Sequence, residues 1–310
     1  MKIVLSLNNR RYLYDYISMG IKMFILGGKY SFYSSYCFDI EEMKEMIEGY
    51  PECSFYVAVN ALYDQHMMDD LENYIERLHD IHVKGIVFQD FGVLQIVKEH
   101  HFDFDMMYAP ETLNTNAMTL KTLKDYGVTS AFLARVIPLE EQVKIQQEAK
   151  IPVMIQGHGI EYIAASKREL LTNYQDAANL EFDVSKDNQL VLQAHDSQYQ
   201  FYIYEDSFGT HIFSKTRLFT LDLLNHIHDF DYWYIETLMM SDEEAIETAS
   251  LYSDALSSYE ANTYNKDVKE YMNLLYKLKL PLDRGFLFDQ TVYKLEDMRK
   301  IDNEKRESNH

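Results

Sequence analysis

Cysteine is nearly absent from this chain of 310 residues, which contains only Cys37 and Cys53. Two thiols in separate segments are too few for a disulfide framework and too far apart for a CxxC ligand pair. Long apolar runs are absent as well, since no stretch approaches the roughly 18 apolar residues of a membrane span. The N-terminal run is short and has no small-residue cleavage site. We therefore expect a cytoplasmic protein with no membrane contact and no metal site built from cysteines.

Basic residues are also scarce relative to acidic ones. The chain has 29 Lys and Arg against 50 Asp and Glu, which gives a formal net charge of −21. A field of this sign repels nucleic acid phosphates unless a local basic patch or a partner protein reverses it. Direct binding of nucleic acid is therefore not expected.

Apolar and aromatic residues are plentiful, and their pattern predicts the fold. Apolar residues make up 47% of the chain, including 25 Tyr and 17 Phe, so a large core can be buried. Strand-length apolar runs occupy residues 3–7, 22–26, 54–59, 85–88, 106–108, 130–133, 152–155 and 232–235. Amphipathic helix-length segments between them occupy residues 12–19, 40–49, 67–79, 91–99, 116–126 and 139–149. This alternation predicts an α/β fold, a (β/α)8 TIM-like barrel, with a doubly wound open sheet as the alternative.

The alternation breaks before the last strand. Short strand-like runs at 190–192, 201–204 and 211–213 are separated by Asp, Ser and Gly turns, which predicts a small β-rich insertion at 175–220. Residues 1–174 then hold the first seven barrel strands and their helices. Residues 221–298 hold the last strand and C-terminal helices, with helical pattern at 242–278, and the polar stretch 299–310 is expected to be a disordered tail.

Polar side chains follow the predicted strands at the end where barrel enzymes carry out chemistry. Residues of this kind are Asn60, Asp90, Glu111, Asn116, Arg135, Gln156, His158 and Glu236. Polar residues also end strands and cap helices in any protein, so each one has a structural alternative. For the set as a whole that alternative is weaker, and we expect a site at the barrel mouth.

Two of these residues suggest specific chemistry. Arg135 suits a carboxylate or phosphate through bidentate contact, although an ion pair with Glu111, Asp90 or Glu236 is the structural alternative. His158 lies between Gly157 and Gly159, and it is either functional or a buried histidine bonded to nearby backbone. We predict that Arg135 and His158 share a pocket. The sequence has no G-x-S-x-G, H-E-x-x-H, P-loop or GxGxxG motif.

Several segments spread over nearly the whole chain form one pattern: YVAVN at 56–60, QDFG at 89–92, Asn116 with the helix after it, FLARVIPL at 132–139, the run from His158-Gly159 to Asn173-Tyr174, Tyr204-Glu205-Asp206 with His211-Ile212, Tyr234-Ile235-Glu236, and Arg284-Gly285-Phe286. Together they resemble the collagenase-like peptidases, family U32. The resemblance implies a barrel-like core. In the family motif a cysteine stands four residues after the His and another seven residues later, and such members are expected to hold an iron–sulfur cluster. Here these positions are Tyr162 and Glu169, and neither is a suitable soft ligand.

The chain is therefore similar to a short, cysteine-poor branch of the family, for which we expect no cofactor and no metal. The family name implies a peptidase, but we find no recognisable nucleophile–base pair. Other members imply formation of 5-hydroxyuridine at the tRNA wobble position, with a small carboxylate such as prephenate as hydroxyl donor. That role implies a non-redox subunit paired with a longer cysteine-bearing family member that grips the tRNA. A stand-alone barrel enzyme acting on a small carboxylate is a third possibility.

The polar residues after the predicted strands and the family resemblance together give the candidate site residues. We assign candidate catalytic roles to His158 and Glu236. The candidate residues for binding a small anionic ligand are Asn60, Asp90, Glu111, Asn116, Arg135 and Arg168.

Overall fold

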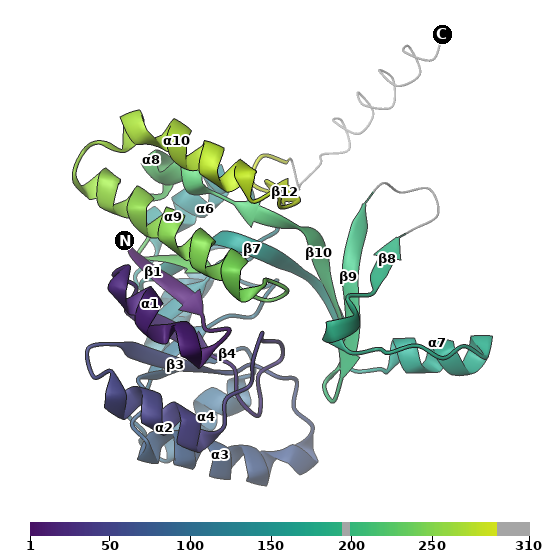
Figure 1. Ribbon diagram of the computed structural model, residues 1–310. Coiled ribbons are helices and arrows are strands. Elements are labelled where there is room, and N and C mark those ends of the chain that lie inside the picture. Colours follow the sequence, from purple (N-terminus) through teal and green to yellow (C-terminus); the bar gives the residue numbers. More distant parts are fainter. Residues whose placement is uncertain (194–198, 290–310) are drawn as a thin grey trace, which may run out of the picture.

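The computed structural model describes residues 1–193 and 199–289, so the expected tail at 299–310 lies outside the described residues. Eight parallel strands form a closed barrel (Figure 1). They are β1 (Lys2–Ser6), β2 (Met23–Leu26), β3 (Ser54–Val59), β4 (Gly85–Phe88), β5 (Asp105–Tyr108), β6 (Ser130–Phe132), β7 (Val153–Ser166) and β11 (Tyr232–Ile235). Strand β11 pairs with both β7 and β1, which closes the sheet. The predicted TIM-like barrel is confirmed, and the alternative of an open sheet is wrong.

Helices follow the barrel strands in sequence. They are α1 (Leu13–Ser18), α2 (Ile40–Gly49), α3 (Met68–Asp80), α4 (Phe91–Glu99), α5 (Ala117–Asp125) and α6 (Leu139–Glu148), with α8 (Leu224–Ile227), α9 (Asp242–Glu260) and α10 (Tyr264–Lys277) in the C-terminal part of the chain. Several begin at a side chain that accepts a hydrogen bond from a first-turn amide: Asp39 for α2, Asp90 for α4, Asn116 for α5 and Ser241 for α9. No helix in the described part of the chain is long and apolar enough to cross a membrane.

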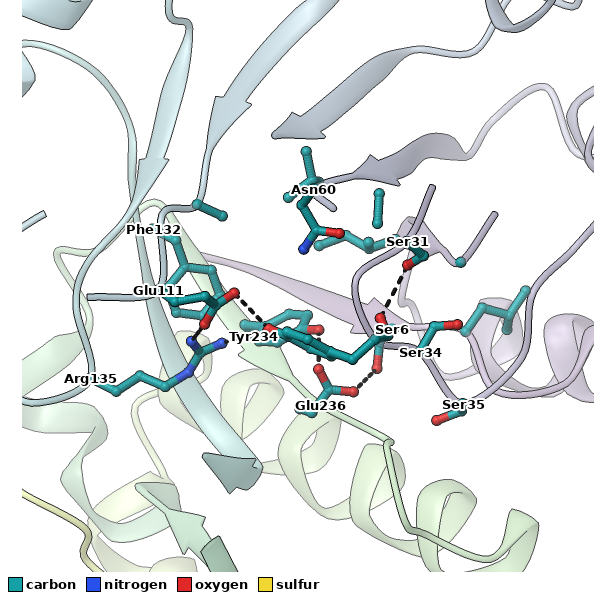
Figure 2. A pocket seen from close by; sticks show the side chains of 17 residues that line it. Ser6, Ser31, Ser34, Ser35, Asn60, Glu111, Phe132, Arg135, Tyr234 and Glu236 are labelled. Carbon is teal, nitrogen blue, oxygen red and sulfur yellow. Dashed lines mark hydrogen bonds and ion pairs between the residues drawn. The ribbon is translucent and has the colours of Figure 1, made fainter. Parts of the chain in front are cut away.

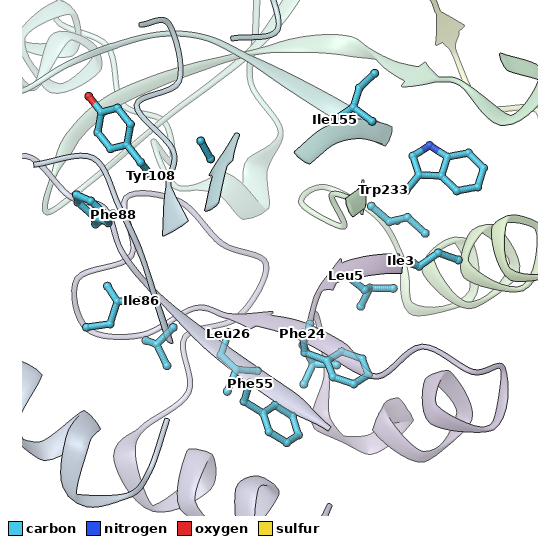
Figure 3. Packing of buried hydrophobic residues seen from close by; sticks show 14 of the residues in the cluster. Ile3, Leu5, Phe24, Leu26, Phe55, Ile86, Phe88, Tyr108, Ile155 and Trp233 are labelled. Atoms are coloured by element: carbon cyan, nitrogen blue, oxygen red, sulfur yellow. The ribbon is translucent and has the colours of Figure 1, made fainter. Parts of the chain in front are cut away.

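Two apolar cores lie on opposite sides of the barrel wall. Alternate residues such as Leu5, Phe24 and Trp233 pack outward against the helices (Figure 3). Their neighbours, such as Val4, Ile25 and Tyr234, fill the barrel interior as a separate cluster. This period of two follows from the strand geometry, and it fixes which residues face the barrel axis.

A β-rich arm projects from the barrel (Figure 1). Strand β7 does not end at residue 155 as expected but continues to Ser166, and β10 (Gly209–Phe219) pairs with it antiparallel. Strands β9 (Gln200–Asp206) and β8 (Val191–Gln193) extend this sheet, α7 (Leu170–Ala178) precedes them, and the short β12 (Leu282–Asp283) pairs with β10. We call residues 160–193 and 199–214 the arm. Gly157 and Gly159 interrupt the apolar run without ending the strand, because glycine is tolerated at a bulge.

Candidate functional site

Polar residues that face the barrel axis converge at the carboxyl ends of the strands. Ser6, Asn60, Glu111 and Glu236 extend the inward alternation that begins with Val4, Ala58, Ala109 and Tyr234. Together with Arg135 they line a cavity with about 500 Å³ of empty volume, including its opening to solvent (Figure 2). The polar lining residues are Ser6, Ser31, Tyr33, Ser34, Ser35, Asn60, Glu111, Arg135, Tyr234 and Glu236.

Arg135 is the only basic residue that lines this pocket in the described part of the chain. Its Nη1 contacts Glu111 in an ion pair, and its Nε donates to Gln156. The hydroxyl of Tyr33 lies 3.4 Å from Nη2, and the guanidinium lies 4.6 Å from the ring centre of Phe132. Burial is the largest influence and favours a lower pKa for Arg135, but Glu111 together with Tyr33, Tyr234 and Glu236 outweighs it and raises the pKa, so the guanidinium stays charged.

Glu236 follows β11, which only β7 separates from β6, and it is almost completely buried. Its carboxylate accepts hydrogen bonds from Tyr234 Oη at 2.7 Å, Ser6 Oγ at 2.8 Å and the amide of Leu238 at 2.9 Å. Burial raises the pKa of Glu236, while these donors and the charge of Arg135 oppose the shift. A buried carboxyl of raised pKa is a candidate proton donor or acceptor.

Asn60 contributes an amide to the same pocket. Its Oδ1 accepts from the amide of Phe32 at 2.9 Å, and this contact holds the loop after β2 against the end of β3. Within the described residues no hydrogen bond from Nδ2 is found. The amide nitrogen is therefore a donor still open to a ligand.

His158 does not share this pocket, so that prediction is wrong. A bulge in β7 pairs Gln156 with Tyr234 but His158 with the next residue, Ile235, which turns His158 to the outer face of the wall. There it is fully buried beneath α9, with Tyr252 Oη 3.3 Å from Nδ1 and no partner for Nε2. Burial lowers the pKa of His158 to about 3, which keeps the imidazole neutral.

The bulge depends on its glycines. Gly159 has φ +110°, and a Cβ there would lie 2.2 Å from the carbonyl oxygen of Glu236. Inside the bulge Gln156 keeps its inward direction. Its Nε2 donates to the carbonyls of Gly159 and Ile160, and its Oε1 accepts a hydrogen bond from Arg135 Nε.

The remaining candidates lie outside the pocket. Asp90 and Asn116 cap α4 and α5, with their side chains accepting from the amides of Gly92 at 2.7 Å and Thr119 at 2.9 Å. Arg168 is exposed on the arm after β7. Of the eight predicted site residues, the structure thus brings together Asn60, Glu111, Arg135 and Glu236.

Sequence reasoning missed two residues near Arg135. Tyr33 lies in the long connection between β2 and α2, where no periodic pattern singles it out. Glu161 follows the bulge and lines a smaller neighbouring cavity with Arg135 and Gln156. Burial raises the pKa of Glu161 to about 7, although Arg135 opposes the shift. The only available signal for Glu161 was its charge within a strand-like run.

The residues of the arm do not fit an iron–sulfur cluster. The ring of Tyr162 packs against Tyr33, Phe213 and Phe32 instead of facing other donors. Cys37 is exposed, Cys53 precedes β3 on the barrel, and no group of three or more His, Cys, Asp or Glu among residues 1–193 and 199–289 is placed to hold a metal ion. A phenol packed among aromatic rings offers no soft ligand at this position.

Comparison with known proteins gives one family and several relatives. The model of peptidase family U32 matches residues 10–297. The chain is 29% identical over 250 residues to "tRNA hydroxylation protein P2" of Bacillus subtilis (strain 168), which covers 77% of this chain and 80% of that protein. It is 27% identical over 142 residues to "tRNA hydroxylation protein P1" of the same organism, covering 45% of this chain and 34% of that longer protein. Among solved structures, N-(5'-phosphoribosyl)anthranilate isomerase from Pyrococcus furiosus aligns with a TM-score of 0.46 and 10% identity over 82% of this chain and 98% of that one.

Proposed function

This chain belongs to peptidase family U32, and from that membership we propose that it is a non-redox subunit of a system that forms 5-hydroxyuridine at the wobble position of tRNA. The observation that carries this proposal is the similarity to tRNA hydroxylation protein P2, which extends over 77% of this chain. Similarity over most of both chains supports a shared role more strongly than a shared barrel does, since barrels host many unrelated chemistries.

The barrel pocket supports binding of a small carboxylate. A guanidinium has five N–H donors, and the contacts to Glu111, Gln156 and Tyr33 occupy three of them. The others, with Asn60 Nδ2, remain for a carboxylate such as prephenate. Because Glu111 already neutralises Arg135 and the pocket also contains Glu236, the pocket carries no excess positive charge, and we expect hydrogen bonding to matter more than net charge for this ligand.

A longer, cysteine-bearing relative completes the proposed system. The arm lacks thiolates, and a net charge of −21 disfavours direct contact with tRNA. In Bacillus subtilis two separate tRNA hydroxylation proteins, P1 and P2, match this chain, which supports a division of labour between two subunits. The partner would supply redox chemistry and RNA contact, and this chain would supply the pocket.

The decisive experiment is gene deletion with complementation. Wobble 5-hydroxyuridine is measured by nucleoside mass spectrometry in the deletion strain carrying wild type, Arg135→Met or an empty vector, with any cysteine-bearing relative intact. We expect the modification to fall on deletion, to return with wild type and to stay low with Arg135→Met. Unchanged modification on deletion would exclude the proposed role.

Peptide hydrolysis is the alternative that the family name suggests. The described residues lining the pocket include several serines but no His, Lys or Cys that could activate or replace them. We expect no cleavage of gelatin or casein by the purified chain. Cleavage that persists through repurification and disappears in Arg135→Met would favour a peptidase.

A stand-alone enzyme acting on a small carboxylate is favoured by one observation, the barrel pocket itself. Copurification separates this alternative from the first. Recovery of a cysteine-bearing relative with the native chain supports the two-subunit system, whereas turnover of a small carboxylate such as prephenate by the pure chain supports the stand-alone enzyme.

A further inference from the structure

The connection between β2 and α2 links the pocket to the arm. We call residues 27–39 the lid loop. This loop contains no helix or strand beyond one isolated bridge between Gly27 and Cys37. It is long for a connection of this kind, and its Ser31, Ser34 and Ser35 line one side of the pocket opposite Arg135 (Figure 2). A segment without regular structure needs external contacts to hold one position.

Tyr33 is the residue of the lid loop that reaches the ion pair of the pocket. Its hydroxyl donates to Glu111 Oε1 at 2.8 Å and lies 3.4 Å from Arg135 Nη2. Burial and the charge of Glu111 raise its pKa well above the usual value, so the hydroxyl stays a neutral donor. Tyr33 thereby occupies one oxygen of Glu111 and leaves the other for Arg135.

The arm, in turn, holds Tyr33. The Tyr33 ring stacks on Tyr162 with 6.3 Å between ring centres and meets Phe213 edge-on at 5.2 Å. Lys186 Nζ, from the outer part of the arm, donates to the backbone carbonyls of Ser34 at 3.0 Å and Ser35 at 2.8 Å. The two contacts are independent, since one fixes the ring and the other fixes the backbone.

We propose that Tyr33 is a positioning residue for the Arg135–Glu111 pair and that the arm fixes Tyr33, so that the arm governs access to the barrel pocket. This inference deepens the proposed function by naming what regulates the same pocket. Its first test needs neither a ligand nor tRNA, so it can succeed or fail by itself. An aromatic pair is worth about 1 kcal/mol, and its loss should raise the open population of the lid roughly fivefold.

The test measures how fast phenylglyoxal modifies Arg135 in the full chain, as read by mass spectrometry. The Arg135 side chain is only 7% exposed, so modification requires the pocket to open. The variants are Tyr162→Leu, which removes the stacked ring, and Lys186→Met, which removes the clamp on Ser34 and Ser35. The matched controls are Tyr162→Phe, which keeps the ring, and Lys215→Met, whose ammonium bonds Gln200 within the arm instead of the lid loop.

We expect both test variants to speed modification of Arg135 several-fold and to increase amide hydrogen exchange over residues 28–38. Both controls should match wild type, and exchange in the barrel strands should not change. Wild-type rates of modification in both test variants would overturn the proposal. If Tyr162→Leu lowers the melting temperature of the whole chain, the modification rate of Lys186→Met alone tests the proposal, because this variant leaves the aromatic packing in place.

A second measurement links the lid to function. In the deletion strain we expect Tyr33→Phe and Lys186→Met to lower 5-hydroxyuridine, and Lys215→Met to leave it at the wild-type level. Full modification by Lys186→Met, alongside loss in Arg135→Met, would overturn regulation by the arm. Failure of wild type itself to restore the modification would instead overturn the proposed function. The rates of Arg135 modification by phenylglyoxal would still test whether the arm controls access to the pocket.

Discussion

Glu236 and His158 are neighbours on adjacent strands, yet they belong to different regions. The amide of Glu236 donates to the carbonyl of His158 at 3.0 Å, and both side chains are almost fully buried. Glu236 faces the barrel axis, where three donors and the charge of Arg135 converge on it. His158 faces the helices, where one nitrogen has no partner. Burial of a titratable group therefore does not identify a site, whereas convergence of groups from several strands does.

A side chain added at Gly159 should disturb the bulge that separates the directions of Glu236 and His158, and it should have the largest effect on stability. A Cβ there would meet the carbonyl oxygen of Glu236 at 2.2 Å, and φ +110° is strained for any L-residue. We expect Gly159→Val to lower the free energy of unfolding by more than about 4 kcal/mol, measured by urea denaturation. Gly49→Ala is the control, because no atom lies within 4 Å of its added methyl group, and it should change stability by less than about 1 kcal/mol. A Gly159→Val protein as stable as wild type would show that the bulge does not require the glycine.

On the pocket side, removal of Arg135 should be nearly as costly. Arg135→Met leaves Glu111 charged with its side chain only 4% exposed, which should lower the free energy of unfolding by about 3–5 kcal/mol. Adding Glu111→Gln to Arg135→Met removes the unpaired buried charge and should recover part of the lost stability. A double-mutant cycle measures the recovery. Equal losses in the single and double variants would argue against a stabilising ion pair.

On the outer face of the barrel wall, His158 should make the free energy of unfolding depend on pH. Its pKa is lowered from 6.5 to about 3 in the folded chain, so below pH 6.5 the unfolded chain binds a proton that the folded chain does not. The contribution of His158 to stability should therefore fall with decreasing pH, by about 2 kcal/mol between pH 6.5 and 4.5. Glu161, whose pKa is raised to about 7, contributes the opposite slope, because its proton binds more tightly to the folded chain.

Comparison with His158→Phe isolates the histidine from Glu161. The stability difference between wild type and this variant should change with pH over that range, as measured by denaturation at each pH. Parallel curves would mean that the imidazole titrates normally. We also expect His158→Phe to retain 5-hydroxyuridine formation if it folds, in contrast to Arg135→Met.

The smallest expected effect concerns the candidates outside the pocket. Asn116→Ala removes the cap of α5 and should cost about 1 kcal/mol of stability with no change in 5-hydroxyuridine. Thermal denaturation and nucleoside analysis of the complemented strain measure the two effects. Loss of the modification in a stable Asn116→Ala protein would place Asn116 in the functional site after all.

The fold was predictable because its signals are local. Each of the eight strand-length runs overlaps a strand of the barrel, since period-two alternation and βα spacing are written into short stretches of sequence. The same alternation, continued past the strand ends, indicates Asn60, Glu111 and Glu236 as inward residues, and Arg135 follows β6 closely. Asp90 and Asn116 have the same local pattern, but the structure uses them to start helices.

The barrel, its two alternating faces and the family of the chain can all be read from the amino-acid sequence. Only the tertiary structure decided which face His158 takes, because a bulge shifts the register by one residue and a shift of one reverses the direction of a side chain. It also decided that Tyr33 reaches Arg135, since that contact joins the lid loop to a residue far along the chain. Contacts of this kind depend on packing of the arm against the lid loop, and no local pattern encodes them.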